Sequence, residues 1–375
     1  MRFSLLSQAL CGATLVLGRP GLLKEIEQGV EEFLSPLLSN PTSHTHMLVP
    51  MEEAFSKFAN APKATSNPAT YNDTGSPEES DFRTENLVES QSTTASSCAS
   101  NPNMRFEWDD YSASDRTALM DAFKCLMKAP SAGGFGPSTS RWEDFVYLHQ
   151  SYTPNVHQNQ KFLLWHRYFV WTFEQVLRDE CGFNRAFFWF DETKHTGAFS
   201  ASDAFSANYL GSLSGNHVCV TDGAFAGHTC NIGPGTGETA HCLSRQGDAS
   251  DTAQCSTDYV NYCLGNNDYK DFETCFENGP HAYGHNGVGG DMADLYGSPN
   301  EPFFWFHHTF VDRVYRIWEL ADTANRYSSI DGTDHNGDAL TLDTVIYMGG
   351  IRPAVTVREV INTLSGDVMC YRYNY

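Results

Sequence analysis

Histidines are concentrated in one aromatic-rich segment of the chain. Residues 281–308, HAYGHNGVGGDMADLYGSPNEPFFWFHH, contain four of the 14 histidines. His281 and His285 are four residues apart and would lie on the same face of a helix, one turn from each other. His307 and His308 are adjacent, so only one of them can point in that direction. An uncharged imidazole in apolar surroundings needs a partner for its nitrogens, and three converging imidazoles indicate a bound metal ion.

A second group of histidines lies earlier, in YLHQSYTPNVHQNQKFLLWHRYFVW. Its members cannot share one face of a continuous helix because they are eight and nine residues apart. Pro154 is also expected to break the segment. We therefore expect His149 late in one helix, His157 in the connecting loop and His166 early in the next helix, an arrangement in which three imidazoles can converge.

Copper chemistry suits these two groups. Imidazole binds copper in both oxidation states, carries no charge and survives oxidants that would destroy a thiolate. Two copper ions that face each other, each held by three histidines, could each pass one electron to dioxygen. The alternatives are zinc bound by three histidines, or histidines that only form hydrogen bonds in the core. Two groups in aromatic-rich helical segments favour the dicopper interpretation.

Several segments that must position these histidines have helical patterns. Residues 112–130 begin with an N-capping serine and continue with helical apolar spacing. Residues 140–152, 162–181 and 303–322 are also predicted to be helical. Residues 197–266, rich in glycine, serine and cysteine, are expected to form long loops stapled by disulfides. No internal repeat or sustained strand alternation is visible, so the pattern predicts a mainly α fold with little β structure.

Charge and the N-terminal segment limit the partners and the location. The 375-residue chain has a formal net charge of −22, which disfavours nucleic acid and anionic membranes as partners. Residues 1–18 have the composition of a secretory signal peptide, so we expect a secreted protein. Residues 19–97 are expected to be a leader or pro-segment and flexible linker, with an amphipathic helix at 22–38 and a glycosylation sequon at Asn72. Residues 98–375 are expected to form one domain.

Cysteine usage agrees with export. Of 11 cysteines, ten follow Cys11, and this even number favours disulfides, as many as five, whose pairing the spacing does not define. None lies in a Cys-x-x-Cys pair, so a zinc-thiolate site is not expected. The remaining histidines are interpreted as surface or leader groups: His44, His46, His195, His217, His228, His241 and His335.

The motifs around both histidine groups resemble those of the type-3 copper proteins, which are tyrosinases, catechol oxidases and haemocyanins. FLLWHRYF at 162–169 resembles the first copper motif, and SPNEPFFWFHHTFVDRVYRIW at 298–318 resembles the second. HAYGHNGVGGDM is similar to the His-x-x-x-His stretch before the second motif. CVTDGAF and HCLSRQGD resemble loops of short fungal members, and the closing MCYRYNY resembles the family's Tyr-x-Tyr signature. The resemblance covers about residues 98–375.

This resemblance implies an antiparallel four-helix-bundle core that holds a dicopper site, with long disulfide-stapled loops. The implied copper ligands are His149, His157 and His166 for the first ion, and His281, His285 and His308 for the second. His307 matches the neighbour that does not bind copper and is expected to shape the substrate entrance. Ser298 matches the position that gates this entrance, through which a substrate ring would dock over His285.

The implied activity is oxidation of phenols to quinones by dioxygen. Monophenol hydroxylation also needs a base, which in the family is a water held by a glutamate and an asparagine. Glu277 matches the glutamate, with Glu273 as the alternative, but Ala282 occupies the asparagine position and Asn286 is the only nearby substitute. We therefore expect strong oxidation of o-diphenols or o-aminophenols and weak monophenol hydroxylation. The alternatives are a full tyrosinase or, less favoured, a reversible oxygen carrier; the spacing defines neither the natural substrate nor the oligomeric state.

Some features depart from the family pattern or have two interpretations. Asn155 replaces the cysteine that forms a thioether with a first-copper histidine in many members, and Glu301 replaces the usual aspartate before proline. The Pro-Tyr-Trp-Asp stretch is altered to FFWFDE. Asp312, one helical turn after the last histidine, is interpreted either as a group that orients this ligand or as one half of an ordinary ion pair. Arg167 is expected to form a structural salt bridge.

Overall fold

The computed structural model describes residues 98, 100–213 and 218–375. The expectations for the signal peptide, the leader, its amphipathic helix and its sequon lie outside the described residues, as do those for His44, His46 and His217. Among the residues that are described, no helix is long and apolar enough to cross a membrane.

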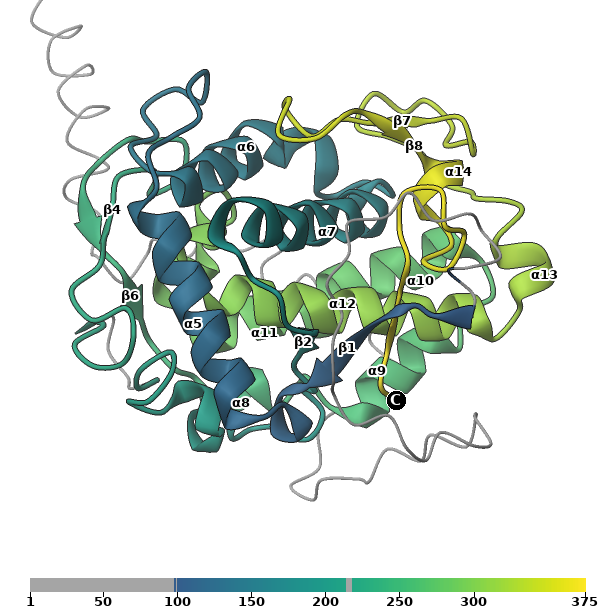
Figure 1. Ribbon diagram of the computed structural model, residues 1–375. Coiled ribbons are helices and arrows are strands. Elements are labelled where there is room, and N and C mark those ends of the chain that lie inside the picture. The colour runs from purple at the N-terminus through teal and green to yellow at the C-terminus, as the bar shows by residue number, and fades with distance from the viewer. Residues whose placement is uncertain (1–97, 99, 214–217) are drawn as a thin grey trace, which may run out of the picture. The chain divides into compact units, whose positions relative to one another are not determined.

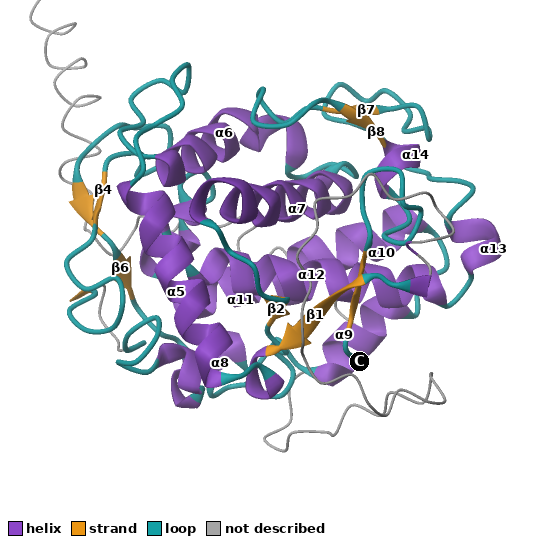
Figure 2. Ribbon diagram, in the orientation of Figure 1, coloured by secondary structure: helices purple, strands orange, loops and turns teal. Residues whose placement is uncertain are grey.

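The described part of the chain is mainly helical, as the sequence pattern predicts (Figure 1; Figure 2). Its long helices are α5 (Ala113–Lys128), α6 (Arg141–Val156), α7 (Phe162–Cys181) and α12 (Phe303–Leu320). Its shorter α-helices are α8 (Ala249–Thr252), α9 (Thr257–Leu264), α10 (Tyr269–Phe276), α11 (Ala282–Val288), α13 (Thr323–Arg326) and α14 (Val357–Val360).

The predicted helix starts are confirmed by their caps. The Ser112 side chain accepts a hydrogen bond from the Asp115 N–H at the start of α5, and Ser140 caps α6 in the same way. The expected break at Pro154 is wrong, because α6 continues through the proline to Val156. Pro154 lies in the last turn of the helix. It removes one backbone hydrogen-bond donor there, and the helix ends soon afterwards.

Large aromatic side chains fill the space between the long helices. Helix α7 packs against α12, and α5 packs against both α6 and α7. The rings of Phe173 on α7 and Trp305 on α12 are stacked with centroids 3.6 Å apart. Trp142 on α6 meets both rings edge-on. The more specific expectation, an antiparallel four-helix bundle, stays a prediction.

The β structure is sparse, as expected. One three-stranded parallel sheet has β1 (Asn103–Glu107) between β2 (Phe187–Trp189) and β9 (Tyr371–Tyr373). The remaining strands form two-residue pairs: β3 (Val218–Cys219) with β6 (Ser244–Arg245), β4 (Thr229–Cys230) with β5 (His241–Cys242), and β7 (Val345–Ile346) with β8 (Val355–Thr356).

Asp312 on α12 belongs to a buried charge network that joins the sheet to the helices. Its carboxylate accepts hydrogen bonds from Arg105 at 3.1 Å, from Arg167 at 2.6 Å and from the hydroxyls of Tyr371 and Tyr373. Burial opposes ionisation of Asp312, but the two guanidinium groups outweigh it and lower its pKa. The ion-pair interpretation of Asp312 and the expected salt bridge of Arg167 are therefore confirmed, and none of these Asp312 partners is a histidine.

The ten cysteines of the described chain form four disulfides rather than five. The bonded pairs are Cys98–Cys370, Cys125–Cys181, Cys219–Cys242 and Cys263–Cys275. Cys230 and Cys255 are buried free thiols, held in different parts of the fold. Region 197–266 is stapled by one internal disulfide as expected, but it also contains α8 and α9.

Candidate metal centre

The first histidine group is built by a helix, a connecting loop and a second helix, as predicted. His149 lies on α6, His157 directly follows α6, and His166 lies one turn into α7. The residue after His157, Gln158, adopts a φ of 59°, a left-handed conformation that is uncommon for a residue other than glycine. This turn directs the chain from α6 to α7 and brings the three rings together.

In this group every Nδ1 atom faces an acceptor. Nδ1 of His149 lies 2.9 Å from the Tyr296 carbonyl, and Nδ1 of His166 lies 2.9 Å from the Phe162 carbonyl. Nδ1 of His157 lies 3.1 Å from Glu277 Oε1. Because Nδ1 carries the donated proton, each Nε2 keeps a lone pair. Nε2 of His149 is 3.2 Å from Nε2 of His157 and 3.4 Å from that of His166.

The second group combines a π-helical turn, α11 and α12. His281 ends the π-helical turn Glu277–His281, His285 lies in α11, and His308 lies in α12. Nδ1 of His281 is 2.9 Å from the Glu277 carbonyl, and Nδ1 of His285 is 2.7 Å from the Met292 carbonyl. Nε2 of His285 and Nε2 of His308 are 3.3 Å apart. Gly289, with a φ of 69°, lets the chain leave α11 after the second histidine.

The two groups face each other. The rings of His166 and His308 are stacked with centroids 4.4 Å apart, and those of His157 and His281 are stacked with centroids 6.2 Å apart. All six rings are buried, and burial lowers the pKa of each, that of His149 to about 4. The neighbouring histidines lower the pKa further for five of them, His149 excepted.

The lone pairs of the first group favour a bound cation. Neutral imidazoles whose Nε2 lone pairs lie 3.2 to 3.4 Å apart repel one another unless a positive ion lies between them. Nε2 of His281 is buried and has no hydrogen-bond partner, which fits the same role. Two sets of imidazole nitrogens, with no thiolate or carboxylate among them, fit copper.

His307 also lies in the second group, although it was expected at the substrate entrance. His281, His285, His307 and His308 can each offer a nitrogen within 4.8 Å of the others. His307 shares a 2.5 Å hydrogen bond with Glu192 through Nδ1, and its Nε2 has no partner. Both side chains are fully buried. Its expected role as the histidine that does not bind metal stays a prediction.

A small cavity opens beside the two groups. Its lining residues are His157, His285, Asn286, Met292, Ala293, Leu295 and Ser298. Ser298 and Asn286, both singled out from the sequence, therefore lie together on its wall, whereas Ala282, Glu277 and His307 are not part of the lining. The side-chain Nδ2 of Asn286 is buried and has no hydrogen-bond partner, so the cavity wall contains a free donor.

Glu277 contacts the first histidine group rather than the cavity. Its Oε1 accepts hydrogen bonds from Nδ1 of His157 and from the backbone N–H of Gln158, at 3.1 and 3.0 Å. Glu273, the alternative, is also fully buried, and burial together with neighbouring Glu277 raises its pKa. The carboxylate of Glu277 thus orients a histidine of the centre.

Sequence reasoning missed the groups that hold the rings in place. Most are backbone carbonyls, of Phe162, Tyr296, Glu277 and Met292, and a carbonyl has no signal in the residue type. Glu192 was also missed. Its only signal was the departure of FFWFDE from the usual aromatic stretch, and its partner His307 is 115 residues away.

These features define a class of protein, a mainly helical protein with two facing imidazole groups that could hold a pair of metal ions. The model of the common central domain of tyrosinase matches residues 139–321. Tyrosinase-like protein phomQ1 of Diaporthe leptostromiformis is 30% identical over 312 residues, which cover 73% of this chain and 78% of the relative. Tyrosinase P of Aspergillus terreus is 29% identical, with coverages of 72% and 92%.

Solved structures of similar proteins have the same fold. A polyphenol oxidase from Thermothelomyces thermophila is 28% identical with a TM-score of 0.68, and the match covers 74% of this chain and 90% of that one. A functional unit of octopus haemocyanin shares the fold, with 19% identity, a TM-score of 0.52 and coverages of 73% and 68%. The chain belongs to the tyrosinase family. It is a copper oxidoreductase of the tyrosinase type, and the predicted resemblance is confirmed.

Proposed function

We propose that the chain oxidises o-diphenols, and by the same chemistry o-aminophenols, to quinones with dioxygen. The observation that carries this proposal is the pair of facing imidazole groups with converging Nε2 atoms. His149, His157 and His166 would hold one copper ion, and His281, His285 and His308 the other. When bound, the two copper ions supply the electron transfer between the phenol and dioxygen.

The cavity beside His285 is the proposed substrate position. Ser298 lines this cavity, and its small side chain restricts the approach to the second group less than a bulky residue would. Asn286 offers an unpartnered donor that can bind a substrate oxygen. His307, held by Glu192, is proposed to support this side of the site rather than to bind copper.

Weak monophenol hydroxylation is part of the proposal. Hydroxylation requires that the phenol first loses its proton to a base in the site. Glu277 Oε1 is already engaged by His157 and Gln158, and the methyl side chain of Ala282 cannot hold a water by hydrogen bonding. A full tyrosinase activity is the second candidate, and reversible oxygen binding is the less favoured one.

The names of relatives support a small phenolic substrate. N-acetyl-6-hydroxytryptophan oxidase ivoB of Emericella nidulans is 26% identical over 341 residues, which cover 73% of this chain and 93% of the relative. Its named substrate is a hydroxylated aromatic ring. We propose that this chain also acts on a small phenol, without assigning the particular compound.

The organisation of the full chain is also proposed. Four disulfides are typical of a protein that passes through a secretory route. We propose that residues 1–18 are a signal peptide, that 19–97 are a leader or pro-segment, and that 98–375 are the oxidase domain.

The direct test compares a monophenol with the corresponding catechol in the copper-loaded protein. We expect rapid catechol oxidation and monophenol turnover lower by about a hundredfold. Ala282→Asn should raise monophenol turnover, because the added amide can hold a water, whereas the similarly shaped control Ala282→Leu should not. Monophenol turnover equal to catechol turnover in the unmodified protein would contradict the proposal.

A further inference from the structure

A third group of metal-binding side chains lies outside the two histidine groups. Cys230 on β4 and His241 on β5 are directly paired across a two-stranded antiparallel ladder, so their side chains lie on the same face. Asp291 reaches them from the short helical turn Gly290–Ala293. One ligand atom from each of the three residues lies within 4.8 Å of the other two.

The contact between His241 and Asp291 requires a positive charge. Nε2 of His241 is 2.7 Å from Oδ1 of Asp291, and Nδ1 of His241 is 2.6 Å from the Thr239 carbonyl. Because Nδ1 must donate its proton to this carbonyl, either a second proton or a metal ion has to lie between Nε2 and the carboxylate. An imidazolium ion satisfies this geometry as it stands, and a metal complex satisfies it after a small shift of the imidazole.

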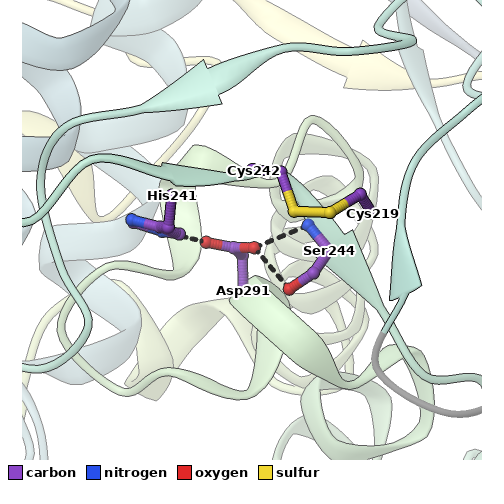
Figure 3. The surroundings of a disulfide bond; sticks show 5 residues. All are labelled: Cys219, His241, Cys242, Ser244 and Asp291. Carbon is purple, nitrogen blue, oxygen red and sulfur yellow. Dashed lines mark hydrogen bonds and ion pairs between the residues drawn. A yellow bond between two sulfur atoms is a disulfide. The ribbon is translucent and has the colours of Figure 1, made fainter.

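The second oxygen of Asp291 is fixed as in a carboxylate ligand. Oδ2 accepts hydrogen bonds from the backbone N–H of Ser244 at 2.7 Å and from its hydroxyl at 2.8 Å (Figure 3). The disulfide Cys219–Cys242 lies beside this contact and joins β5, which carries His241, to β3, which pairs with the strand of Ser244. Hydrogen bonds of this kind orient the ligands of metal sites.

Cys230 favours the metal over the proton. An ion pair between His241 and Asp291 does not need a sulfur atom nearby, whereas a metal ion can bind the sulfur atom as a third ligand. The thiol of Cys230 is fully buried and forms no disulfide, although eight other cysteines of the described chain do. Burial and the nearby carboxylates of Asp291, Glu301 and Glu143 raise the pKa of this thiol, so it keeps its proton until a metal ion displaces it.

We propose that Cys230, His241 and Asp291 bind one zinc ion, separate from the two copper ions of the histidine groups. Zinc accepts one thiolate, one imidazole and one carboxylate, with a water as the fourth ligand. Ligand bonds of about 2.0–2.2 Å in tetrahedral geometry place nitrogen and oxygen about 3.4 Å apart. The imidazole of His241 must therefore move slightly away from Asp291, and its partly exposed position on a two-residue strand permits this.

The zinc ion would stabilise one wall of the copper centre. Asp291 belongs to the same short turn as Met292, whose carbonyl accepts the hydrogen bond from His285. Met292 and Ala293 of this turn also line the cavity. Cys230 and His241 lie far from this turn in sequence, so the metal would fasten a disulfide-bonded hairpin to the segment that positions a copper ligand.

The test measures both metals in the same preparation. The purified full chain is loaded with copper, dialysed against zinc and then against buffer, and its metal content is determined. We expect one zinc per chain in addition to two copper ions. Cys230→Ser and, independently, His241→Ala should lose the zinc and keep both copper ions. Cys255→Ser, which removes the other buried free thiol, should keep the zinc.

Cobalt identifies the sulfur ligand. Co²⁺ in the third site should give a sulfur-to-cobalt charge-transfer absorption that Cys230→Ser lacks and Cys255→Ser retains. Absence of zinc beyond the histidine groups, or the same zinc content in the unmodified protein, Cys230→Ser and His241→Ala, would overturn the proposal and leave an ion pair between His241 and Asp291. Neither result changes the copper count, so the copper proposal is tested separately.

Discussion

The two histidine groups differ in how their rings are held. In the first group all three Nδ1 atoms have an acceptor, and one of these acceptors is the carboxylate of Glu277. In the second group His308 has no acceptor for its buried Nδ1. Its ring is instead packed between other rings, with centroids 4.2 Å from Phe304 and 4.4 Å from His166. The first group is therefore oriented by hydrogen bonds, and the second depends in part on packing.

The largest expected effect tests which rings bind copper. His166→Ala and His308→Ala should each reduce copper from two ions to about one per chain and abolish oxidation, because one copper ion cannot exchange two electrons with dioxygen. His307→Ala, at a neighbouring ring of the second group, should keep both copper ions and change the KM of the phenol. Metal analysis and steady-state kinetics measure both. Loss of a copper ion in His307→Ala with retention in His308→Ala would reverse the assignment.

A second expected effect distinguishes a residue that stabilises the fold from one that acts on the metal centre. Asp312 lies one turn from His308 on the same helix but pairs with Arg105 and Arg167. Asp312→Asn should lower the free energy of unfolding by about 3–5 kcal/mol, because it leaves buried guanidinium groups without their counterion. Urea unfolding measures this loss. The fraction that remains folded should still bind two copper ions, and selective loss of copper would show that Asp312 does act on a ligand.

The carboxylate of Glu277 distinguishes the two groups directly. Glu277→Gln should weaken copper binding in the first group by about 10–100-fold, the usual effect of losing a hydrogen-bond partner of a metal ligand. Glu192→Gln is the matched control, since Glu192 holds His307, which is not a proposed ligand. Competition with a copper chelator measures both. Equal weakening in the two variants would contradict the difference between the groups.

A smaller expected effect is a loss of stability at low pH. Burial lowers the pKa of His149 from 6.5 to about 4. Between these pH values the unfolded chain therefore binds a proton at His149 that the folded chain does not bind. The copper-free protein should lose stability as pH falls below about 6.5, continuing until about pH 4. His149→Phe should reduce this dependence of Tm on pH. A Tm of the copper-free protein that does not change between pH 7 and 5 would contradict the account.

Sequence patterns were sufficient for the elements and the metal-binding side chains. Helix α7 begins and ends where the apolar pattern predicts, and His149, His157 and His166 converge because a turn separates two helices. The pairing of Asp312 was not predictable from its place on α12, because its partners come from β1, α7 and β9. The continuation of α6 through Pro154 was not predictable either, because it depends on Pro154 lying in the last turn of the helix.

The cysteine and loop regions were less predictable. His241 was interpreted as a surface group and zinc-thiolate binding was not expected, because Cys230 has no neighbouring cysteine in sequence. The strand pairing Cys230↔His241 and the approach of Asp291 arise only in the folded chain. The backbone acceptors of the histidine rings, such as the Tyr296 and Met292 carbonyls, could not be predicted for a different reason. Every residue type has a backbone carbonyl, so the sequence does not mark which one binds a ring.

The central claim is that two facing imidazole groups hold two copper ions. The most direct measurement is the copper content of the chain after loading with copper in the presence of excess zinc, combined with dioxygen uptake by the reduced protein. The account predicts two copper ions per chain, unchanged in Cys230→Ser, and uptake of one dioxygen molecule per two copper ions. Zinc in place of copper in the histidine groups, or dioxygen uptake that is absent with both copper ions bound, would contradict it.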